Sequence, residues 1–196
     1  MKALYILLCF LALFALSGCE DRGAVETSVD KDHTKQPAPL IPELEYTEIS
    51  EQIFSADIYG QAISECGFNE ENCFLKDEKV YGYDYVSLFG LKGTLSVYLD
   101  EGRISSIVFG SEPFNKTADF NDSYVDMNEQ LSEKIGVDIV SPVLMGADEA
   151  DDDAEMLLNG NGYYLSEYRS DTIHAELKSC GVKGTATIVV ECSLAK

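Results

Sequence analysis

Apolar residues recur with the period of a helix in two parts of the chain. In the first part, five residues follow one another at alternating steps of four and three: Ile49, Ile53, Ala56, Gly60 and Ile63. A helix would place all five on one face. This spacing predicts an amphipathic helix near residues 48–65.

The same period returns in the second half of the chain. Its apolar positions are Tyr124, Met127, Leu131 and Ile135. Gly136 follows directly and can take the left-handed conformation that commonly ends a helix. These residues predict a helix that ends near Gly136, and we expect a shorter helix near residues 149–159.

Six further segments have the pattern of strands, with alternating faces in several of them and glycine-containing turns between neighbours. The predicted strands lie near residues 79–89, 94–99, 103–109, 163–169, 172–179 and 185–194. Helices followed by strand meanders predict an α+β fold, in which helices cover one face of an antiparallel sheet. Two helix-plus-strands halves, residues 43–115 and 116–196, would repeat loosely, because residues 181–185 echo residues 90–94.

A different pattern opens the chain. Lys2 is followed by an apolar run over residues 3–16, which is too short to span a bilayer comfortably, and then by Ser17, Gly18 and Cys19. A positive head, an apolar stretch and a small-residue cleavage site indicate a secretory signal peptide over residues 1–18. With the cysteine directly after Ser-Gly, this segment resembles the signal of bacterial lipoproteins.

The resemblance covers the targeting segment alone and implies that Cys19 becomes the acylated first residue of the mature chain. Several acyl chains hold a protein on a membrane much more firmly than one chain does. The resemblance thus implies a lipid-anchored protein of the bacterial cell envelope that faces the periplasm or the exterior. Glu20 stands where the enterobacterial inner-membrane retention signal would be Asp, which favours the outer membrane. The alternatives are an ordinary cleaved signal and a transmembrane anchor.

Composition separates a tether from a domain. Residues 19–42 show no hydrophobic period and mix charged, small polar and proline residues, so we expect a flexible tether there and one α+β domain over residues 43–196.

The chain has 35 acidic and 14 basic residues and a formal net charge of -21. Such a field repels nucleic acids and anionic headgroups and attracts basic proteins. The alternative is that the charge serves solubility alone.

Four cysteines remain after the signal and the lipid anchor: Cys66, Cys73, Cys180 and Cys192. An even number in an exported domain predicts two disulfide bonds, with three possible connectivities. We favour Cys66 with Cys73, since the short loop between them can fold back, which leaves Cys180 for Cys192. A tight hairpin at residues 181–184 would oppose the second bond, because Cys192 would lie about 20 Å along its strand from the residue that faces Cys180. A zinc site is the alternative reading, although no Cys-x-x-Cys spacing is present.

The sequence contains an acidic run over residues 148–155 that suggests calcium, with candidate ligands Asp148, Asp151, Asp152 and Asp153. The run lacks the ligand pattern of an EF-hand loop, and carboxylates at the start of a helix are also stabilised by its dipole. His174 alternates with the apolar residues of its strand and should point to solvent, so it has no nucleophile beside it. We therefore expect no catalytic residue, no cofactor and no resident metal.

Tyrosines are the better indication of activity. Tyr81, Tyr83 and Tyr85 alternate along one predicted strand, and Tyr98 has polar neighbours on the next. If these faces coincide, the four rings form an array set in an acidic field, which suits recognition of a basic protein. The alternative is that the rings pack under the helices or form ordinary cross-strand pairs.

These observations favour a membrane-anchored protein-binding module. An inhibitor of a basic protein that targets the cell envelope, or an immunity protein against one, would fit this description. A structural or assembly lipoprotein of the envelope is the alternative. A calcium-binding or hydrolytic role comes third, because the residue constellations that it needs are missing.

Overall fold

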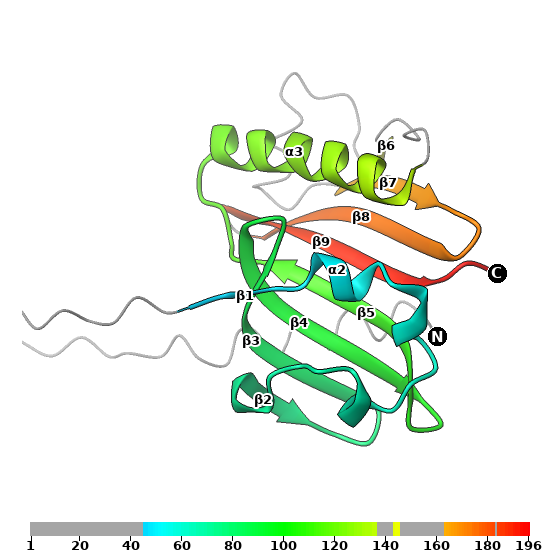
Figure 1. The fold of residues 1–196 in the computed structure, drawn as a ribbon. Coiled ribbons are helices and arrows are strands. Elements are labelled where there is room, and N and C mark those ends of the chain that lie inside the picture. Colours follow the sequence, from blue (N-terminus) through cyan, green and yellow to red (C-terminus); the bar gives the residue numbers. More distant parts are fainter. Residues whose placement is uncertain (1–44, 137–142, 146–162, 183) are drawn as a thin grey trace, which may run out of the picture. The chain divides into compact units, whose positions relative to one another are not determined.

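Nine strands form one sheet in the computed structural model, which describes residues 45–136, 143–145, 163–182 and 184–196. The strands are β1 (Thr47–Glu48), β2 (Cys73–Lys76), β3 (Val80–Leu88), β4 (Leu91–Asp100), β5 (Arg103–Ser111), β6 (Val143–Met145), β7 (Tyr163–Arg169), β8 (Ile173–Val182) and β9 (Thr185–Leu194). Their order across the sheet is β1-β3-β4-β5-β9-β8-β7-β6, and β2 also pairs with β3 (Figure 1). Only the β1–β3 pair is parallel among these described strands. The fold is therefore a mixed α+β fold dominated by an antiparallel sheet.

The six predicted strands are confirmed as β3, β4, β5, β7, β8 and β9. Their ends lie within a few residues of the expected ones, because alternation marks a strand's interior better than its ends. The remaining strands are β1, β2 and β6, with two, four and three residues. Segments this short are too brief to display a period.

The last strand of the sequence lies in the middle of the sheet. β9 pairs with β8 on one side and with β5 on the other. Phe109 faces Val190 and Ile107 faces Cys192 across the β5–β9 ladder. The Ser111 hydroxyl oxygen accepts a 2.9 Å hydrogen bond from the Ile188 N–H, just beyond the end of that ladder. One ladder thus joins β3–β5 to β7–β9.

The core lies on one face of the sheet, which we call the inner face. Leu95, Phe109, Val190 and Leu177 lie side by side on β4, β5, β9 and β8, and each is 0% exposed. Because side chains alternate along a strand, their sequence neighbours point to the opposite, outer face.

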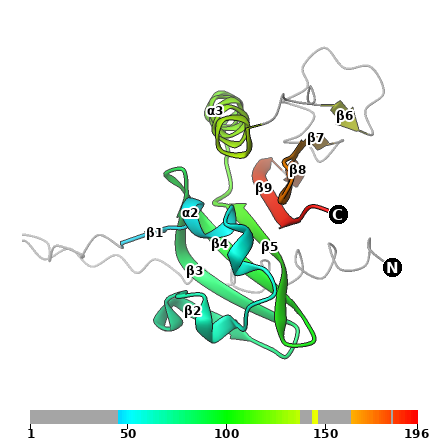
Figure 2. The same cartoon turned by 45° about the vertical axis from the view of Figure 1, so that its right-hand side comes forward.

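The helix predicted to end near Gly136 is confirmed as α3 (Thr117–Ile135). Gly136 has φ 75°, and its N–H donates to the Ser132 carbonyl at 2.9 Å. The buried side of α3 carries Phe120, Tyr124, Met127, Asn128, Leu131 and Ile135. In Figure 2 the helix is seen nearly end-on, beside β7, β8 and β9.

Polar groups fix how α3 sits against the sheet. The Tyr168 hydroxyl of β7 donates to Asn128 Oδ1, and the Asn128 amide donates to the Tyr124 carbonyl at 2.9 Å. The Tyr124 hydroxyl lies 3.4 Å from the Ser166 hydroxyl. All four residues are buried, so losing one partner would leave a polar group without water or protein to bind.

The prediction of one helix over residues 48–65 is wrong. Its place is taken by α2 (Ser50–Ile53) and by the short 3-10 helices η1 (Ala56–Ile58) and η2 (Ile63–Glu65), followed by η3 (Glu70–Asn72). Gly60 has φ 85°, and its N–H donates to the Ile104 carbonyl of β5 at 2.8 Å. Ile104 in turn donates to the Gln61 carbonyl at 3.0 Å. Pairing with β5 takes the backbone groups that a continuous helix would need.

The suggested repeat aligns Gly93 with Gly184, but the two glycines have different positions relative to their strands. Gly93 lies inside β4, whereas Gly184 has φ 88° just before β9. The helix expected near residues 149–159 lies outside the described residues. Among the helices that are described, none is long and apolar enough to cross a membrane.

Candidate functional site

The exposed side of α3 carries a continuous line of carboxylates, which we call the acidic stripe. Its members are Asp119, Asp122, Asp126, Glu129 and Glu133. They follow one another at steps of three and four, so they lie above one another on the helix. Lys116 pairs with Asp119 at 3.8 Å, and Lys134 pairs with Glu51 of α2. The other four stripe residues form no ion pair with any described residue.

The stripe weakens the helix that carries it. Like charges three or four residues apart each cost about 0.2–0.5 kcal/mol. Glu133 also lies in the last turn, where the helix dipole favours a positive charge. Beside the stripe, Val125 is 54% exposed although it belongs to a helix with a buried apolar side. An apolar side chain flanked by carboxylates is the complement of an amphipathic cationic segment.

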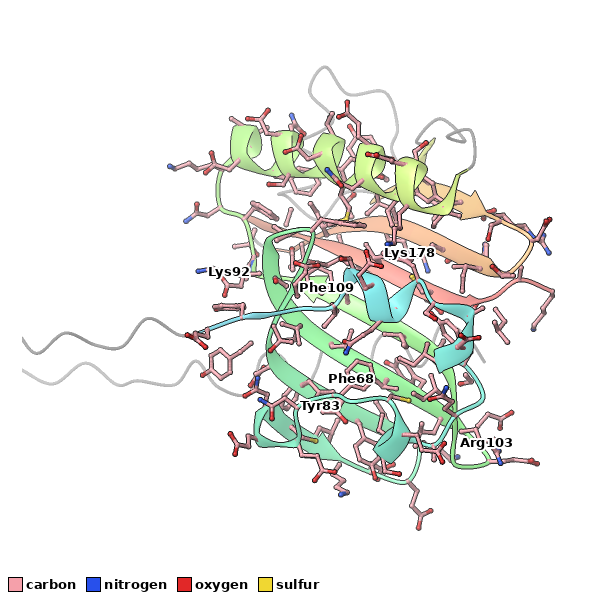
Figure 3. The ribbon with its side chains drawn as sticks, in the orientation of Figure 1. Phe68, Tyr83, Lys92, Arg103, Phe109 and Lys178 are labelled. Carbon is pink, nitrogen blue, oxygen red and sulfur yellow. The ribbon has the colours of Figure 1, made fainter. Side chains whose placement is uncertain are left out.

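A second row of carboxylates crosses the outer face of the sheet. Glu167, Glu176 and Glu191 lie directly opposite one another on β7, β8 and β9. Lys178 pairs with Glu176 and lies 3.0 Å from Glu191 (Figure 3). Burial lowers the pKa of Lys178, but its hydrogen bonds and attraction to the two carboxylates outweigh that effect and raise the pKa. One cation thus neutralises part of the row.

The prediction that the four tyrosines form one exposed array is wrong. Tyr81 and Tyr83 face Val97 and Leu95 across the β3–β4 ladder, so they point to the inner face. Tyr83 is 4% exposed, and burial, with further contributions from neighbours led by Cys73, raises its pKa to about 12. Tyr98 pairs with Val80 and points to the outer face.

A β-bulge causes the difference. Tyr83 pairs with Leu95 and Val86 pairs with Gly93, so Asp84 and Tyr85 together oppose one residue of β4. Tyr85 takes φ 55°, which is uncommon for a residue with a side chain. The extra residue returns Val86 to the inner face, the same face as Tyr83.

Tyr85 lies in a cluster with Tyr46, a half-buried residue that the sequence pattern did not single out. Tyr46 and Tyr85 contact edge to face, with ring centroids 5.8 Å apart. The Lys92 ammonium lies 4.7 Å from the Tyr46 ring centroid. The Tyr46 hydroxyl donates to Glu112 at 2.6 Å, and this bond raises the pKa of Tyr46 to about 12.

Phe74 and Leu75 of β2 are also exposed, at 57% and 40%. A Cβ on Gly82 would lie 2.6 Å from the Phe74 ring and 3.1 Å from Leu75 Cβ, so both side chains lie over this glycine. Among the four candidate tyrosines, Tyr85, at 37%, is the one that is exposed.

The four cysteines are free thiols in this structure. The Cys66 thiol donates to the Ala62 carbonyl at 3.3 Å, and the Cys73 thiol donates to the Leu75 carbonyl at 3.2 Å. Both sulfurs lie close enough to Tyr83 to contribute to its raised pKa. Burial raises the pKa of the Cys66 thiol. The Cys66–Cys73 bond stays a prediction.

The pairing of Cys180 with Cys192 is wrong. Cys192 faces Ala175 and Cys180 faces Thr187 across the β8–β9 ladder. Cys180 lies five positions after Ala175 along β8, which is about 16 Å, and a disulfide needs Cα atoms less than about 7 Å apart. The two side chains also point to opposite faces of the sheet. The sequence indicated that a tight hairpin at residues 181–184 would keep these two cysteines apart, and the structure has that hairpin.

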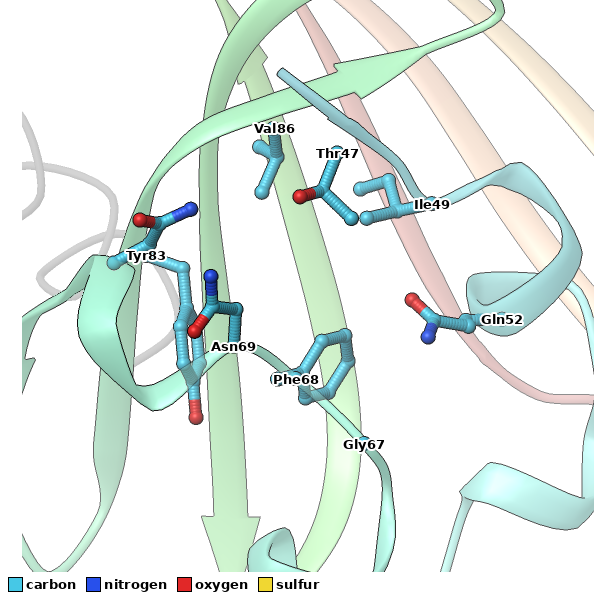
Figure 4. A pocket seen from close by; sticks show the side chains of 9 residues that line it. Thr47, Ile49, Gln52, Gly67, Phe68, Asn69, Tyr83 and Val86 are labelled. Carbon is cyan, nitrogen blue, oxygen red and sulfur yellow. The ribbon is translucent and has the colours of Figure 1, made fainter. Parts of the chain in front are cut away.

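A small hollow lies between the segment that enters α2, the loop after Cys66 and β3 (Figure 4). Its volume is about 50 Å³. Polar side chains line it from three segments: Thr47, Gln52, Asn69 and Asn72. The apolar part of its wall is formed by Ile49, Phe68, Tyr83 and Val86. The Phe68 and Tyr83 rings lie 5.2 Å apart and are tilted by 37°.

The sequence did not indicate this hollow, because its polar residues are uncharged and its walls come from segments that lie apart in the sequence. Gln52 lines the hollow, and its side-chain oxygen Oε1 is closed to solvent and has no hydrogen-bond partner among the described residues. Asn69 Oδ1 accepts from the Glu71 N–H at 3.0 Å. The Asn69 NH₂ group therefore remains as a hydrogen-bond donor for another molecule.

The remaining candidate residues are His174, Cys19 and the calcium candidates. His174 lies on the outer face, as expected from its alternation with Ile173 and Ala175. Cys19 and the calcium candidates Asp148, Asp151, Asp152 and Asp153 lie outside the described residues. Within the described ranges, no group of His, Cys, Asp and Glu side chains could hold a metal ion.

In comparisons with known proteins, no protein-family model, no curated protein and no solved structure matches this chain.

Proposed function

We propose that this protein is a membrane-anchored binding module for a basic protein, and that the acidic stripe with Val125 is the surface that binds. The single observation that carries the proposal is the stripe itself. Four of its carboxylates have no ion-pair partner among the described residues, although their repulsion weakens α3. A cationic, amphipathic segment would relieve that repulsion and cover Val125. An inhibitor of a basic envelope-targeting protein, or an immunity protein against one, would act in this way.

The anchor is part of the proposal. Lipidation of Cys19, after removal of a signal over residues 1–18, would hold the domain on the envelope, with residues 19–42 as a tether. The lipoprotein-like order Ser17, Gly18, Cys19 supports it, and Glu20 favours the outer membrane.

We also infer that helices cover the whole inner face of the sheet, with α3 over β7–β9 and α2 with the 3-10 helices over β3–β5. Burial supports this, since Leu88, Leu95 and Leu177 are 0% exposed. The ion pair between Lys134 and Glu51 links α3 to α2 on that side. The outer side of α3 would then be a free surface of the domain.

A titration of the full chain in detergent tests the binding surface. The probes are two short peptides of identical Lys and Leu composition, one with an amphipathic helical pattern and one with a shuffled pattern. We expect the amphipathic peptide to bind more tightly, and to stay bound at moderate salt, because apolar contact with Val125 is not screened. Val125→Ser should weaken its binding about tenfold, since burying one valine contributes about 1.5–3 kcal/mol.

Matched variants separate the stripe from charge in general. Leu194→Ser changes another exposed apolar residue and should leave peptide binding unchanged. Neutralising Asp122, Asp126 and Glu129 should abolish binding, whereas neutralising the exposed Glu78, Asp100 and Glu101 should have little effect. Equal binding of the two peptides, lost at moderate salt, would contradict the proposal and favour the structural envelope role. Capture from an envelope extract with the same variants would then identify the natural partner.

A further inference from the structure

We propose that the hollow beside Phe68 and Tyr83 binds the acetamido group of an N-acetylated amino sugar. This inference does not rest on the proposed function, because none of the residues lining the hollow belongs to α3. It would give the domain a second ligand, a neutral saccharide, at the other end of its sheet.

The polar groups of the hollow are those that an amide needs. Gln52 Oε1 is buried without a partner, so the free protein leaves one acceptor unsatisfied. Asn69 donates from its NH₂ group, because its oxygen is held by the Glu71 N–H. A secondary amide presents one N–H and one carbonyl oxygen, so it can accept from Asn69 and donate to Gln52. The second bond requires the Gln52 side chain to turn, because its oxygen is closed to solvent in the free protein. Figure 4 shows both side chains directed into the hollow from opposite walls.

The walls select against charge. None of the described residues that line the hollow is charged, so an ionic ligand would lose its hydration without a counter-charge from them. Ile49 and Val86 offer an apolar surface that suits a methyl group, and Phe68 and Tyr83 offer aromatic rings. Thr47 and Asn72 supply further hydrogen-bonding groups, which sugar hydroxyls can use.

The size fits a small group rather than a whole ligand. A hollow of about 50 Å³ has room for about three or four waters, and an acetamido group has four heavy atoms. The ring of the sugar would therefore lie at the mouth of the hollow, against exposed Asn69 and half-buried Phe68.

Nuclear magnetic resonance of the full chain in detergent tests the assignment. N-acetylglucosamine is titrated while the side-chain amide signals of Gln52 and Asn69 are followed, and glucose, glucosamine and N-acetylalanine methylamide serve as comparison ligands. We expect saturable shifts of both amide signals with N-acetylglucosamine, and none with glucose or glucosamine. Shifts with N-acetylalanine methylamide alone would assign the hollow to peptides and overturn the proposal.

Two variants probe the two ends of the amide. Asn69→Asp keeps the acceptor for the Glu71 N–H but removes the NH₂ donor, so N-acetylglucosamine binding should weaken at least tenfold in a folded protein. Gln52→Leu should also abolish binding, while the melting temperature of the free protein stays equal or rises, because an unsatisfied acceptor is removed. Gln130→Leu, an exposed change on α3, is the control and should bind like the unmodified chain.

The results of the saccharide titration can be distinguished from those of the peptide titration that tests the proposed function. Undiminished binding in Asn69→Asp, or equal shifts with glucose, would overturn the acetamido assignment. Absence of any saturable shift would show that the hollow holds water only. In each case the peptide titration on α3 would be unaffected, so the two proposals can fail separately.

Discussion

The carboxylate of Glu48 accepts a 3.0 Å hydrogen bond from the backbone N–H of Gly90 and so ties β1 to the turn between β3 and β4. The same carboxylate accepts from the Phe89 N–H at 2.9 Å, the Ser87 hydroxyl at 2.9 Å and the Ser50 N–H at 3.1 Å. Burial raises the pKa of Glu48, but these four bonds outweigh it, and the pKa lies below its ordinary value of 4.5.

Replacing Glu48 by Gln should destabilise the protein at neutral pH by about 1–2 kcal/mol, because hydrogen bonds to an ionised group are lost. The folded pKa is depressed, so this stabilisation is present above pH 4.5 and is lost as the pH falls through the folded value. Urea unfolding at neutral and acidic pH measures the difference between the two proteins. Glu45→Gln, an exposed neighbour, should show no such difference. A gap that persists in acid would contradict this account.

Gly93 and Gly110 lie on neighbouring strands but differ in the space around them. A Cβ on Gly93 would lie 2.1 Å from the Gly110 carbonyl oxygen and 2.8 Å from the Phe109 ring. A Cβ on Gly110 would come no closer than 3.9 Å to Thr94 Oγ1. We expect Gly93→Ala to destabilise the protein by about 3 kcal/mol and Gly110→Ala to stay within about 0.5 kcal/mol. Equal melting temperatures for the two variants would contradict the register of β4 and β5.

The contact between Tyr168 and Asn128 should contribute more to stability than the contact between Tyr124 and Ser166. Tyr168→Phe leaves Asn128 Oδ1 buried without a donor, so we expect a loss of about 1–2 kcal/mol. Tyr124→Phe removes a 3.4 Å contact and should cost less than about 0.5 kcal/mol. Chemical denaturation compares them. The reverse order would contradict this ranking, and losses below about 0.5 kcal/mol in both variants would show that α3 is held mainly by its apolar side.

A disulfide between Cys66 and Cys73 should form when the protein is exported to an oxidising compartment. Closing this short loop would stabilise the fold by about 2.5 kcal/mol, so reduction should lower the melting temperature. Peptide mapping of the unreduced protein tests the bond directly. Cys192, which is 1% exposed, should resist alkylation until the protein unfolds. Discovery of a Cys180–Cys192 peptide would contradict the β8–β9 register.

The parts of the fold that a sequence period describes could be predicted. Ile173, Ala175 and Leu177 alternate with polar residues and do face the core. Leu131 and Ile135 lie on the buried side of a helix that ends at a left-handed glycine. In such segments one simple geometry sets the face of every residue.

The predictions that were wrong concern features that depend on contacts between distant segments. The bulge at Tyr85 moves Val86 to the face of Tyr83, and no local signal in the strand announces it. Gly60 pairs with Ile104, which lies far along the chain, and that pairing replaces the expected helix. The hollow likewise brings Gln52, Asn69 and Tyr83 together from separate segments, so its chemistry could not be read from any one of them.

The central position of β9 sets the order in which this chain can fold. The hairpins of β3, β4 and β5 join residues close in sequence, so they can form early during synthesis. β5 then has an unpaired edge until β9, some eighty residues later, becomes available. We expect closing that long loop to be the slow step, and until it occurs both halves would expose strands that can pair with other chains. A chain interrupted before β9 would therefore be prone to aggregate rather than merely less stable.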